Sequence, residues 1–382
     1  MLSLEFLPEH DAKFFAAIPA APAVFLLRAD DPQAEPYVSK TANLQRRLTR
    51  LLSAPEEHLR RLNLRDRVRH VEYTLTGSDF ESGMLLYRTL RRVLPESYCD
   101  RLRLRFAPLV KFNLDNPWPR AYVTQRITGL RGDSVYYGPF RTRPAAEKFL
   151  DDSLDLFKIR RCDFEIHPDP AYPGCIYSEM KMCLAPCFAG CTEEQYRDEL
   201  GRVRAFLDSG GQSLVRELSE QRERASASLE FEQAAALHAR LEKISAATRL
   251  PEIVRRLDLL AGVVVQPAAE AASVALFRFQ RGVLAEPVLF PVQQGEGKPQ
   301  SMESRVQGAL ASSEAPVRAS PIEMMENLAI LKSWYYRSIK VGEIFLADDQ
   351  GELPLRRLVR GISRVFRGEK AKTDPMTTRF AQ

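Results

Sequence analysis

The chain has 382 residues, of which 45% are hydrophobic and 27% are charged, and its formal net charge is +5. These values are ordinary for a soluble globular protein of two or three domains, and no apolar run approaches the length of a membrane span. No charged start followed by an apolar run lies near Met1, so a secreted protein is disfavoured and we expect a cytoplasmic chain with reduced cysteines.

Two strands and a basic helix are expected near the N-terminus. Apolar residues over 23–28 predict one strand, residues 37–40 a second, and apolar residues at helical spacing over 43–52 a helix. Arginines crowd this third of the chain: Arg46, Arg47, Arg50, Arg60, Arg61, Arg65, Arg67, Arg69, Arg88, Arg91, Arg92, Arg101, Arg103 and Arg105. Such a stretch is typical of a protein that binds phosphate backbones, although a solvated helix face explains any single arginine equally well.

Further strands are predicted over 68–76 and 120–137, where apolar and polar residues alternate. Trp118 precedes the second of these segments between two prolines. Its ring suits stacking on a nucleic-acid base, and it suits a packing anchor equally well.

Five of the six cysteines follow a helix predicted over 145–157: Cys162, Cys175, Cys183, Cys187 and Cys191. In a cytoplasmic chain such clustering favours metal ligands over disulfides. The first four are separated by twelve, seven and three residues, unlike the C-x-x-C knuckles of a zinc ribbon, so we favour an iron–sulfur cluster over zinc. The alternative is that these cysteines are small buried apolar residues.

Three short motifs beside the cysteines carry a family resemblance. They are YYGPF at 136–140, LFKIRRC at 156–162 and CLAPC at 183–187. In this order they resemble the middle of UvrC, the incision subunit of bacterial nucleotide excision repair. The resemblance implies a 4Fe-4S cluster held by Cys162, Cys175, Cys183 and Cys187, with Cys191 as an extra thiol that competes for the fourth position.

The hairpin and basic helix resemble the GIY-YIG nuclease domain that opens UvrC. Carried over position by position, the resemblance implies catalytic roles for Tyr37, Lys40 and Arg47, and contacts to DNA from Arg46 and Arg50.

Four positions of that nuclease site depart from the family: Ala23 and Ser39 replace glycines, and two others replace residues that carry the chemistry. Phe25 stands where the family has its first tyrosine, and Leu86 stands where it has the metal-binding glutamate; Tyr87 takes that place if the alignment slips by one. Leucine cannot ligate Mg²⁺, and phenylalanine cannot pass a proton. We therefore expect efficient cleavage to be lost, with Mg²⁺ relevant only if the nuclease is active and Glu81 as the alternative ligand.

A helix over 193–207 is followed by a helical hairpin over 213–245 that bends near residues 229–232. The hairpin resembles the UVR motif, which in that family docks on UvrB. The resemblance implies that Phe231 is an exposed aromatic anchor and that Glu232 lies beside it in the interface. The alternative is a hairpin that keeps Phe231 in its own core.

Strands are predicted over 262–265, 272–279 and 283–292, then a mobile linker over 293–320, a helix over 322–337 and a basic tail over 356–372. The resemblance to UvrC covers residues 10–295, and we expect a truncated homologue without room for the family's RNase H-like nuclease.

The expected fold class is α+β and multidomain. We expect a degenerate GIY-YIG-like domain with a small mixed sheet over 10–105, a middle region with the cysteine cluster over 106–207 and the hairpin over 208–250. A short β region over 251–295 follows, and then a linker, helix and basic tail of unknown role over 296–382.

By resemblance the protein binds DNA and docks on UvrB, without contacting membrane and with an impaired or absent nuclease. The alternatives are an active single-incision endonuclease on damaged DNA and a non-catalytic regulator that competes for UvrB.

Overall fold

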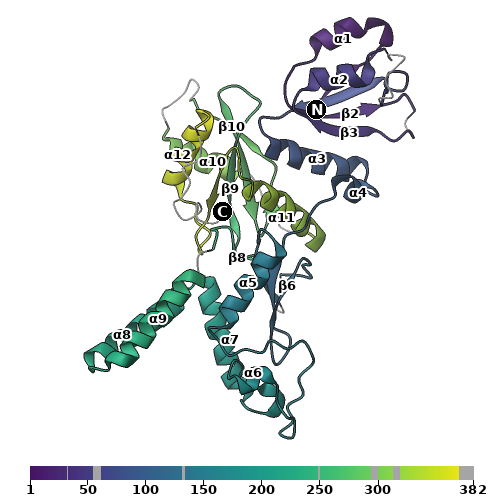
Figure 1. Ribbon diagram of the computed structural model, residues 1–382. Helices are drawn as coiled ribbons and strands as arrows, with labels where there is room; N and C mark the ends of the chain where they lie inside the picture. The colour runs from purple at the N-terminus through teal and green to yellow at the C-terminus, as the bar shows by residue number, and fades with distance from the viewer. Residues whose placement is uncertain are drawn as a thin grey trace.

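The computed structural model describes residues 1–382 except 32, 55–61, 131–133, 248–249, 294–299, 313–318 and 370–382. Arg60 and Arg61 therefore lie outside the described residues. Three small sheets follow one another along the chain, and a helical hairpin projects from the middle of the molecule (Figure 1). The expected α+β multidomain class is confirmed.

The N-terminal sheet has the order β1 (Leu2–Glu5), β4 (His70–Leu75), β2 (Ala23–Arg28) and β3 (Tyr37–Thr41). Helices α1 (Asp11–Ala17) and α2 (Leu44–Leu52) bury their apolar faces against it, and a short 3-10 turn, Pro8–His10, precedes α1. All described pairs are antiparallel, so the expected mixed sheet is corrected. Strands β2 and β3 are antiparallel because they are joined as a hairpin.

Helix α3 (Asp79–Val93) extends from this sheet to the C-terminal part of the chain. Its Phe80 and Met84 share a core with Phe277 and with Leu328 and Trp334 of α11 (Pro321–Tyr335). Figure 1 shows α3 running beside α11, with the short α4 (Tyr98–Leu102) after it. The segment that follows the N-terminal sheet is therefore packed onto the C-terminal region.

The middle sheet has the order β6 (Ala121–Thr124), β5 (Leu109–Asn113), β7 (Ser134–Gly138) and β8 (Arg255–Arg256). Helices α5 (Arg143–Leu154) and α7 (Glu193–Asp208) pack on it around one apolar core. Trp118 is buried in that core and meets the Tyr196 ring edge-on at 5.3 Å between centroids. Trp118 is thus a packing anchor, and base stacking is excluded while it stays buried.

Two helices, α8 (Gln212–Ala227) and α9 (Phe231–Ala247), form the expected hairpin. Leu214, Leu218, Leu241 and Ile244 join the core of the middle region, so the base of the hairpin is anchored there. The bend lies at the far end, away from that core (Figure 1).

The C-terminal sheet has the order β11 (Val283–Leu284), β10 (Ser273–Gln280), β9 (Ala261–Pro267) and β13 (Glu343–Leu346), and β12 (Val288–Pro291) also pairs with β10. Strand β13 comes from the segment without an assigned motif, yet it pairs with β9 along its whole length. Residues on both sides of position 296 therefore contribute strands to one sheet.

The expected mobile linker is corrected within the described residues. Part of it forms α10 (Met302–Ala311), whose Val306 and Leu310 are buried against the C-terminal sheet. The basic tail likewise forms α12 (Leu355–Phe366), with Leu358 and Ile362 in the same core. The sequence carried the signal for α12, whose apolar residues recur at helical spacing, whereas α10 has only a short apolar stripe among polar residues.

Gly361 allows α12 to lie close to the sheet. A Cβ at this position would stand 2.0 Å from the Cζ atom of Phe345. We expect Gly361→Ala to lower the free energy of unfolding by about 1–3 kcal/mol, because the ring has to move within a packed core. Urea unfolding monitored by circular dichroism measures this change.

Gly308 of α10 is the matched control, because nothing lies within 4 Å of a Cβ built there. Gly308→Ala is expected to stabilise the protein by roughly 0.5–1 kcal/mol through helix propensity. Equal responses of the two variants would contradict the packing of α12 on Phe345.

Candidate functional site

Tyr37 and Arg47 lie together on one face of the N-terminal sheet. The Nη2 atom of Arg47 donates a hydrogen bond to the Tyr37 hydroxyl at 2.9 Å, and the Tyr37 ring lies 6.1 Å from that of Phe25 between centroids. Phe25 is fully buried in β2. The buried Nε of Arg47 has no hydrogen-bond partner among the described residues. A phosphate oxygen is a chemically suitable acceptor for such a guanidinium.

Lys40 does not join that pair. Side chains alternate along a strand, so positions 37 and 40 of β3 leave on opposite faces. The Nζ atom of Lys40 lies 2.5 Å from a carboxylate oxygen of Asp79 at the start of α3, and Arg337 donates to the other oxygen. Burial raises the pKa of Asp79, but the hydrogen bonds from Lys40 and Arg337 outweigh it and lower the pKa below its ordinary value.

Glu81 caps α3. Its Oε2 accepts a hydrogen bond from the backbone N–H of Gly77 at 2.7 Å, while the Ser78 hydroxyl accepts from the Glu81 N–H at 3.1 Å. These reciprocal bonds satisfy backbone groups that the first turn of a helix leaves unpaired. One oxygen of the Glu81 carboxylate is therefore engaged in this cap.

Neither of the two positions expected to match a metal-binding glutamate carries a carboxylate. Leu86 is half-buried, and Tyr87 is buried with its hydroxyl 2.8 Å from Oε2 of Glu326 in α11. The other oxygen of Glu326 accepts from the Tyr98 hydroxyl at 2.8 Å. Burial and the bond to Glu326 raise the pKa of Tyr87. This arrangement is a structural contact between regions.

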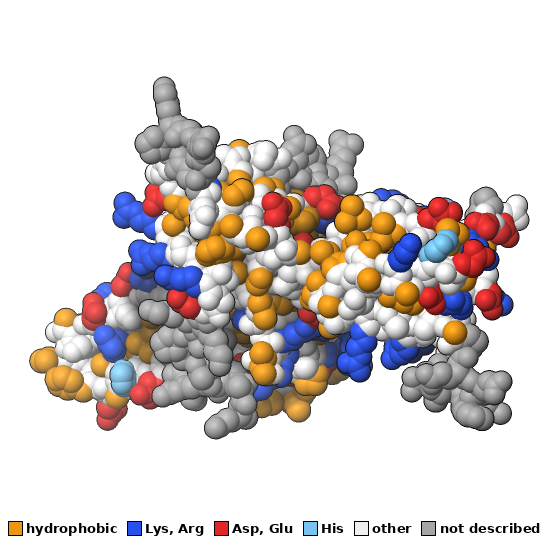
Figure 2. All heavy atoms as spheres, turned by 90° about the horizontal axis from the view of Figure 1, so that it is seen from above, with side chains coloured by type: hydrophobic (Ala, Val, Ile, Leu, Met, Phe, Trp, Pro, Cys, Tyr) orange, Lys and Arg blue, Asp and Glu red, His pale blue; other side chains and the backbone are white. Residues whose placement is uncertain are grey.

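Many of the N-terminal arginines have intramolecular partners. Arg65 binds Asp11 and two carbonyl oxygens, Arg88 binds Glu286, and Arg101 binds Glu35. Arg46 and Arg50 of α2 are exposed. The view from above shows basic side chains interspersed with acidic ones (Figure 2). The arginine count therefore overstates the surface available to phosphate.

Arg160 organises the cysteine loop from the inside. Its guanidinium is almost fully buried and donates to the carbonyl oxygens of Trp118 and Phe164, both at 2.7 Å, and its Nη1 lies 3.9 Å from the Cys162 sulfur. Within the loop, only the short helix α6 (Ile176–Glu179) and a 3-10 turn, Pro186–Phe188, are regular. The loop depends on side-chain bonds for its shape.

The thiols predicted as ligands are close enough to influence one another. Burial, and to a smaller extent the neighbouring Cys162, Cys187 and Cys175, raise the pKa of Cys183 to about 11. The Ala185 N–H donates to the Cys183 sulfur at 3.3 Å. Among the residues that the structure describes, however, no three His, Cys, Asp or Glu side chains form a ready-made metal site.

The bend of the hairpin carries exposed apolar side chains. Phe231 is 65% exposed and Leu229, in a left-handed conformation, is 72% exposed. Glu232 is exposed beside them at the start of α9. The alternative in which Phe231 lies in the hairpin's own core is therefore wrong, since the bend offers it no core.

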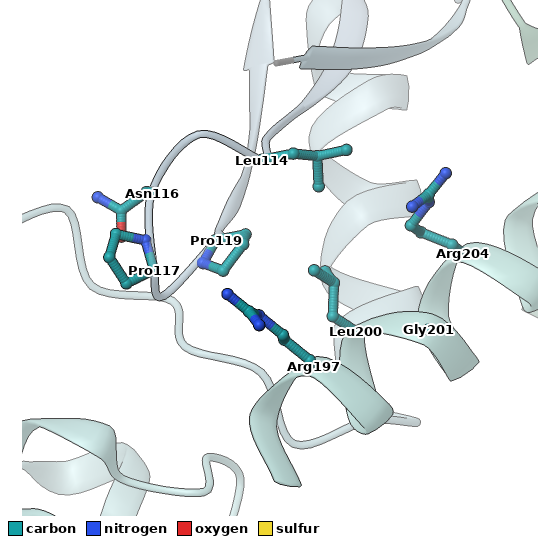
Figure 3. Close-up of a pocket in the computed structure, with 8 residues that line it drawn as sticks. All are labelled: Leu114, Asn116, Pro117, Pro119, Arg197, Leu200, Gly201 and Arg204. Atoms are coloured by element: carbon teal, nitrogen blue, oxygen red, sulfur yellow. The ribbon is translucent and has the colours of Figure 1, made fainter. Parts of the chain in front are cut away.

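A hollow that sequence reasoning missed lies between α7 and the turn joining β5 to β6 (Figure 3). Arg197 and Arg204 border it. Their spacing of seven residues, two turns of one helix, indicates in the sequence that both lie on one face of α7. The hollow itself could not be predicted, because the opposing turn comes from a distant part of the sequence.

Two family descriptions match the chain. Residues 108–206 match the middle domain of the UvrC/Cho excinuclease, and residues 212–247 match the UvrB/uvrC motif. These ranges are the middle region with its cysteine loop and the projecting hairpin.

Similar proteins carry one description, "UvrABC system protein C". That of Moorella thermoacetica is 27% identical over 337 residues, which is 88% of this chain and 51% of that protein. That of Stenotrophomonas maltophilia is 28% identical over 298 residues, 77% of this chain and 48% of that protein. The chain thus spans about half the length of these relatives. No solved structure matches, and none of the described helices has the length and apolarity to cross a membrane.

Proposed function

Because this chain belongs to the UvrC family, we propose that it acts in nucleotide excision repair by binding DNA and docking on UvrB. The observation that carries the proposal is the hairpin, which is anchored at its base and presents Phe231 to solvent at its bend. A large exposed aromatic residue at the end of a rigid projection is a typical anchor for a protein interface.

The N-terminal region, in this proposal, retains a phosphate-binding pair and has lost efficient cleavage. Arg47, oriented by Tyr37, would contact the phosphate, whereas Phe25 has no hydroxyl to help activate water. Leu86 supplies no metal ligand, and Glu81 is engaged in its helix cap. DNA binding without rapid incision follows.

Cys162, Cys175, Cys183 and Cys187 would hold the iron–sulfur cluster. These residues are chemically suitable ligands, because thiolates bind iron and all four thiols lie in one loop. The N–H of Ala185 already donates a hydrogen bond to one of the sulfurs. The four thiols would have to move closer together to bind the cluster, because no three of the described His, Cys, Asp or Glu side chains already form a metal site. When bound, the cluster would cross-link a loop that has little regular structure.

A lesion-bearing duplex tests the nuclease part of the proposal. With UvrB and Mg²⁺ the chain is expected to bind the duplex but to cut it about a thousandfold more slowly than a UvrC with an intact site, because a metal contributes several kcal/mol to the transition state. Tyr37→Phe is therefore expected to leave the small amount of product unchanged. Gel analysis of end-labelled strands measures both.

Two other outcomes would point to different functions. Robust incision on one side of the lesion, abolished by Tyr37→Phe, would establish a single-incision endonuclease. Slower incision by a full-length UvrC after addition of this chain, without incision of its own, would establish a regulator that competes for UvrB.

A further inference from the structure

The hollow beside α7 has apolar walls and a basic border. Its volume is about 280 Å³, with Leu114, Pro117 and Pro119 on one side and Leu200 on the other. Figure 3 shows the side chain of Arg197 extending from α7 toward Pro119, and that of Arg204 at the other end of the same hollow.

The turn that forms one wall is held in place. The Tyr196 hydroxyl of α7 donates to the Pro119 carbonyl at 2.8 Å, and the Arg160 guanidinium donates to the Trp118 carbonyl at 2.7 Å. The Trp118 N–H is in turn bound by the Asn116 side chain at 2.8 Å. The hollow is therefore formed before any ligand arrives, which lowers the entropy cost of binding.

Its two guanidinium groups are available to an anion. Arg204 makes no ion pair with another described residue, and Arg197 pairs only with Glu193 one turn away on the exposed face of α7. An exposed pair of this kind contributes little and exchanges readily for a ligand. Arginine is also the side chain best suited to phosphate, because its planar donors bind two oxygens at once.

Gly201 lies between the two arginines and has no packing role. It is exposed in the middle of α7, and nothing lies within 4 Å of a Cβ built on it. Glycine disfavours a helix interior, so the sequence keeps a destabilising residue where alanine would fit. Its effect is to leave the floor of the hollow open between the guanidinium groups.

We infer that this hollow is a subsite for the phosphodiester backbone of DNA, an inference that rests on the proposed function. The prolines and leucines suit the apolar face of a sugar, and the arginines suit the flanking phosphates. Arg120, directly after the turn, stacks on the Tyr122 ring with its guanidinium carbon 4.8 Å from the centroid and adds a third cation nearby.

Binding of a fluorescent DNA duplex to the full chain, measured by anisotropy at several salt concentrations, tests the inference. Arg197→Gln combined with Arg204→Gln is expected to weaken binding roughly tenfold and to reduce the slope of log K against log salt by about two, one for each lost phosphate contact. Gly201→Leu is expected to weaken binding by filling the hollow while the melting temperature stays equal or rises.

Arg143→Gln combined with Lys148→Gln is the matched control, because it removes two exposed charges from α5 of the same region. If the wild-type chain binds no DNA at low salt, the proposed function itself fails. If it binds and all variants match the control, the subsite is wrong and the proposed function stands. Loss of UvrB association with unchanged DNA binding would also overturn the inference, because the hollow would then bind an acidic protein group.

Discussion

Cys183→Ser is expected to remove most of the iron bound to the protein and to lower its melting temperature. The Cys183 sulfur accepts a hydrogen bond from the Ala185 N–H, and Cys162, Cys187 and Cys175 lie near enough to raise the pKa of its thiol further. Serine keeps the size but is a poor ligand for iron, which prefers thiolates. Because ligation energy is folding energy in such loops, losing one ligand should also loosen the segment around Arg160.

Iron content and visible absorbance of anaerobically purified protein measure the first effect, and thermal unfolding measures the second. Cys99→Ser is the control, because Cys99 lies outside the loop near Glu326. A wild-type protein without iron, or a Cys183→Ser protein with undiminished iron, would rule out the cluster. Zinc in place of iron would give a colourless protein with the same four ligands.

Local periodicity was sufficient to predict most elements from the sequence. The strand over 23–28 is a continuous apolar run and the helix over 43–52 has a one-sided apolar pattern, and the structure contains β2 and α2 at nearly the same residues. The hairpin was predicted for the same reason, since each of its helices carries its own apolar stripe. These features depend on neighbours a few residues away.

Contacts between distant segments could not be predicted in this way. Strand β13 is four residues long and is stabilised by pairing with β9, about eighty positions earlier in the chain. Glu326 accepts hydrogen bonds from Tyr87 and Tyr98, more than two hundred residues away. No periodic pattern encodes such partners, so the packing of α3 on the C-terminal region was missed.

In the candidate nuclease site, too, some contacts follow from the local sequence and others join distant segments. Tyr37 and Arg47 meet because a strand and the following helix fold back on each other. The separation of Lys40 from them could have been read from the odd spacing along β3. Its ion pair with Asp79, which Arg337 shares, could not be read in this way, because Arg337 lies just after α11 and 258 positions along the chain from Asp79.

Replacing the aromatic residue at the hairpin bend is expected to abolish most of the affinity for UvrB. Phe231 exposes most of its ring, so Phe231→Ala removes a large apolar contact without disturbing a core. Truncating an interface anchor typically costs 2 kcal/mol or more, which is a loss of about thirtyfold or greater in Kd. Isothermal titration calorimetry with purified UvrB measures it.

A set of variants distinguishes a loss of docking from a loss of folding. Because Phe231 contributes little to the hairpin core, its replacement should leave the melting temperature unchanged, and Glu232→Gln should weaken docking less because an exposed charge contributes little. Ile339→Ala removes an even more exposed apolar side chain remote in sequence from the hairpin and should leave UvrB binding intact. If Phe231→Ala binds UvrB as tightly as the wild-type chain, the bend is not the docking surface, and the anchored, projecting hairpin must serve another contact.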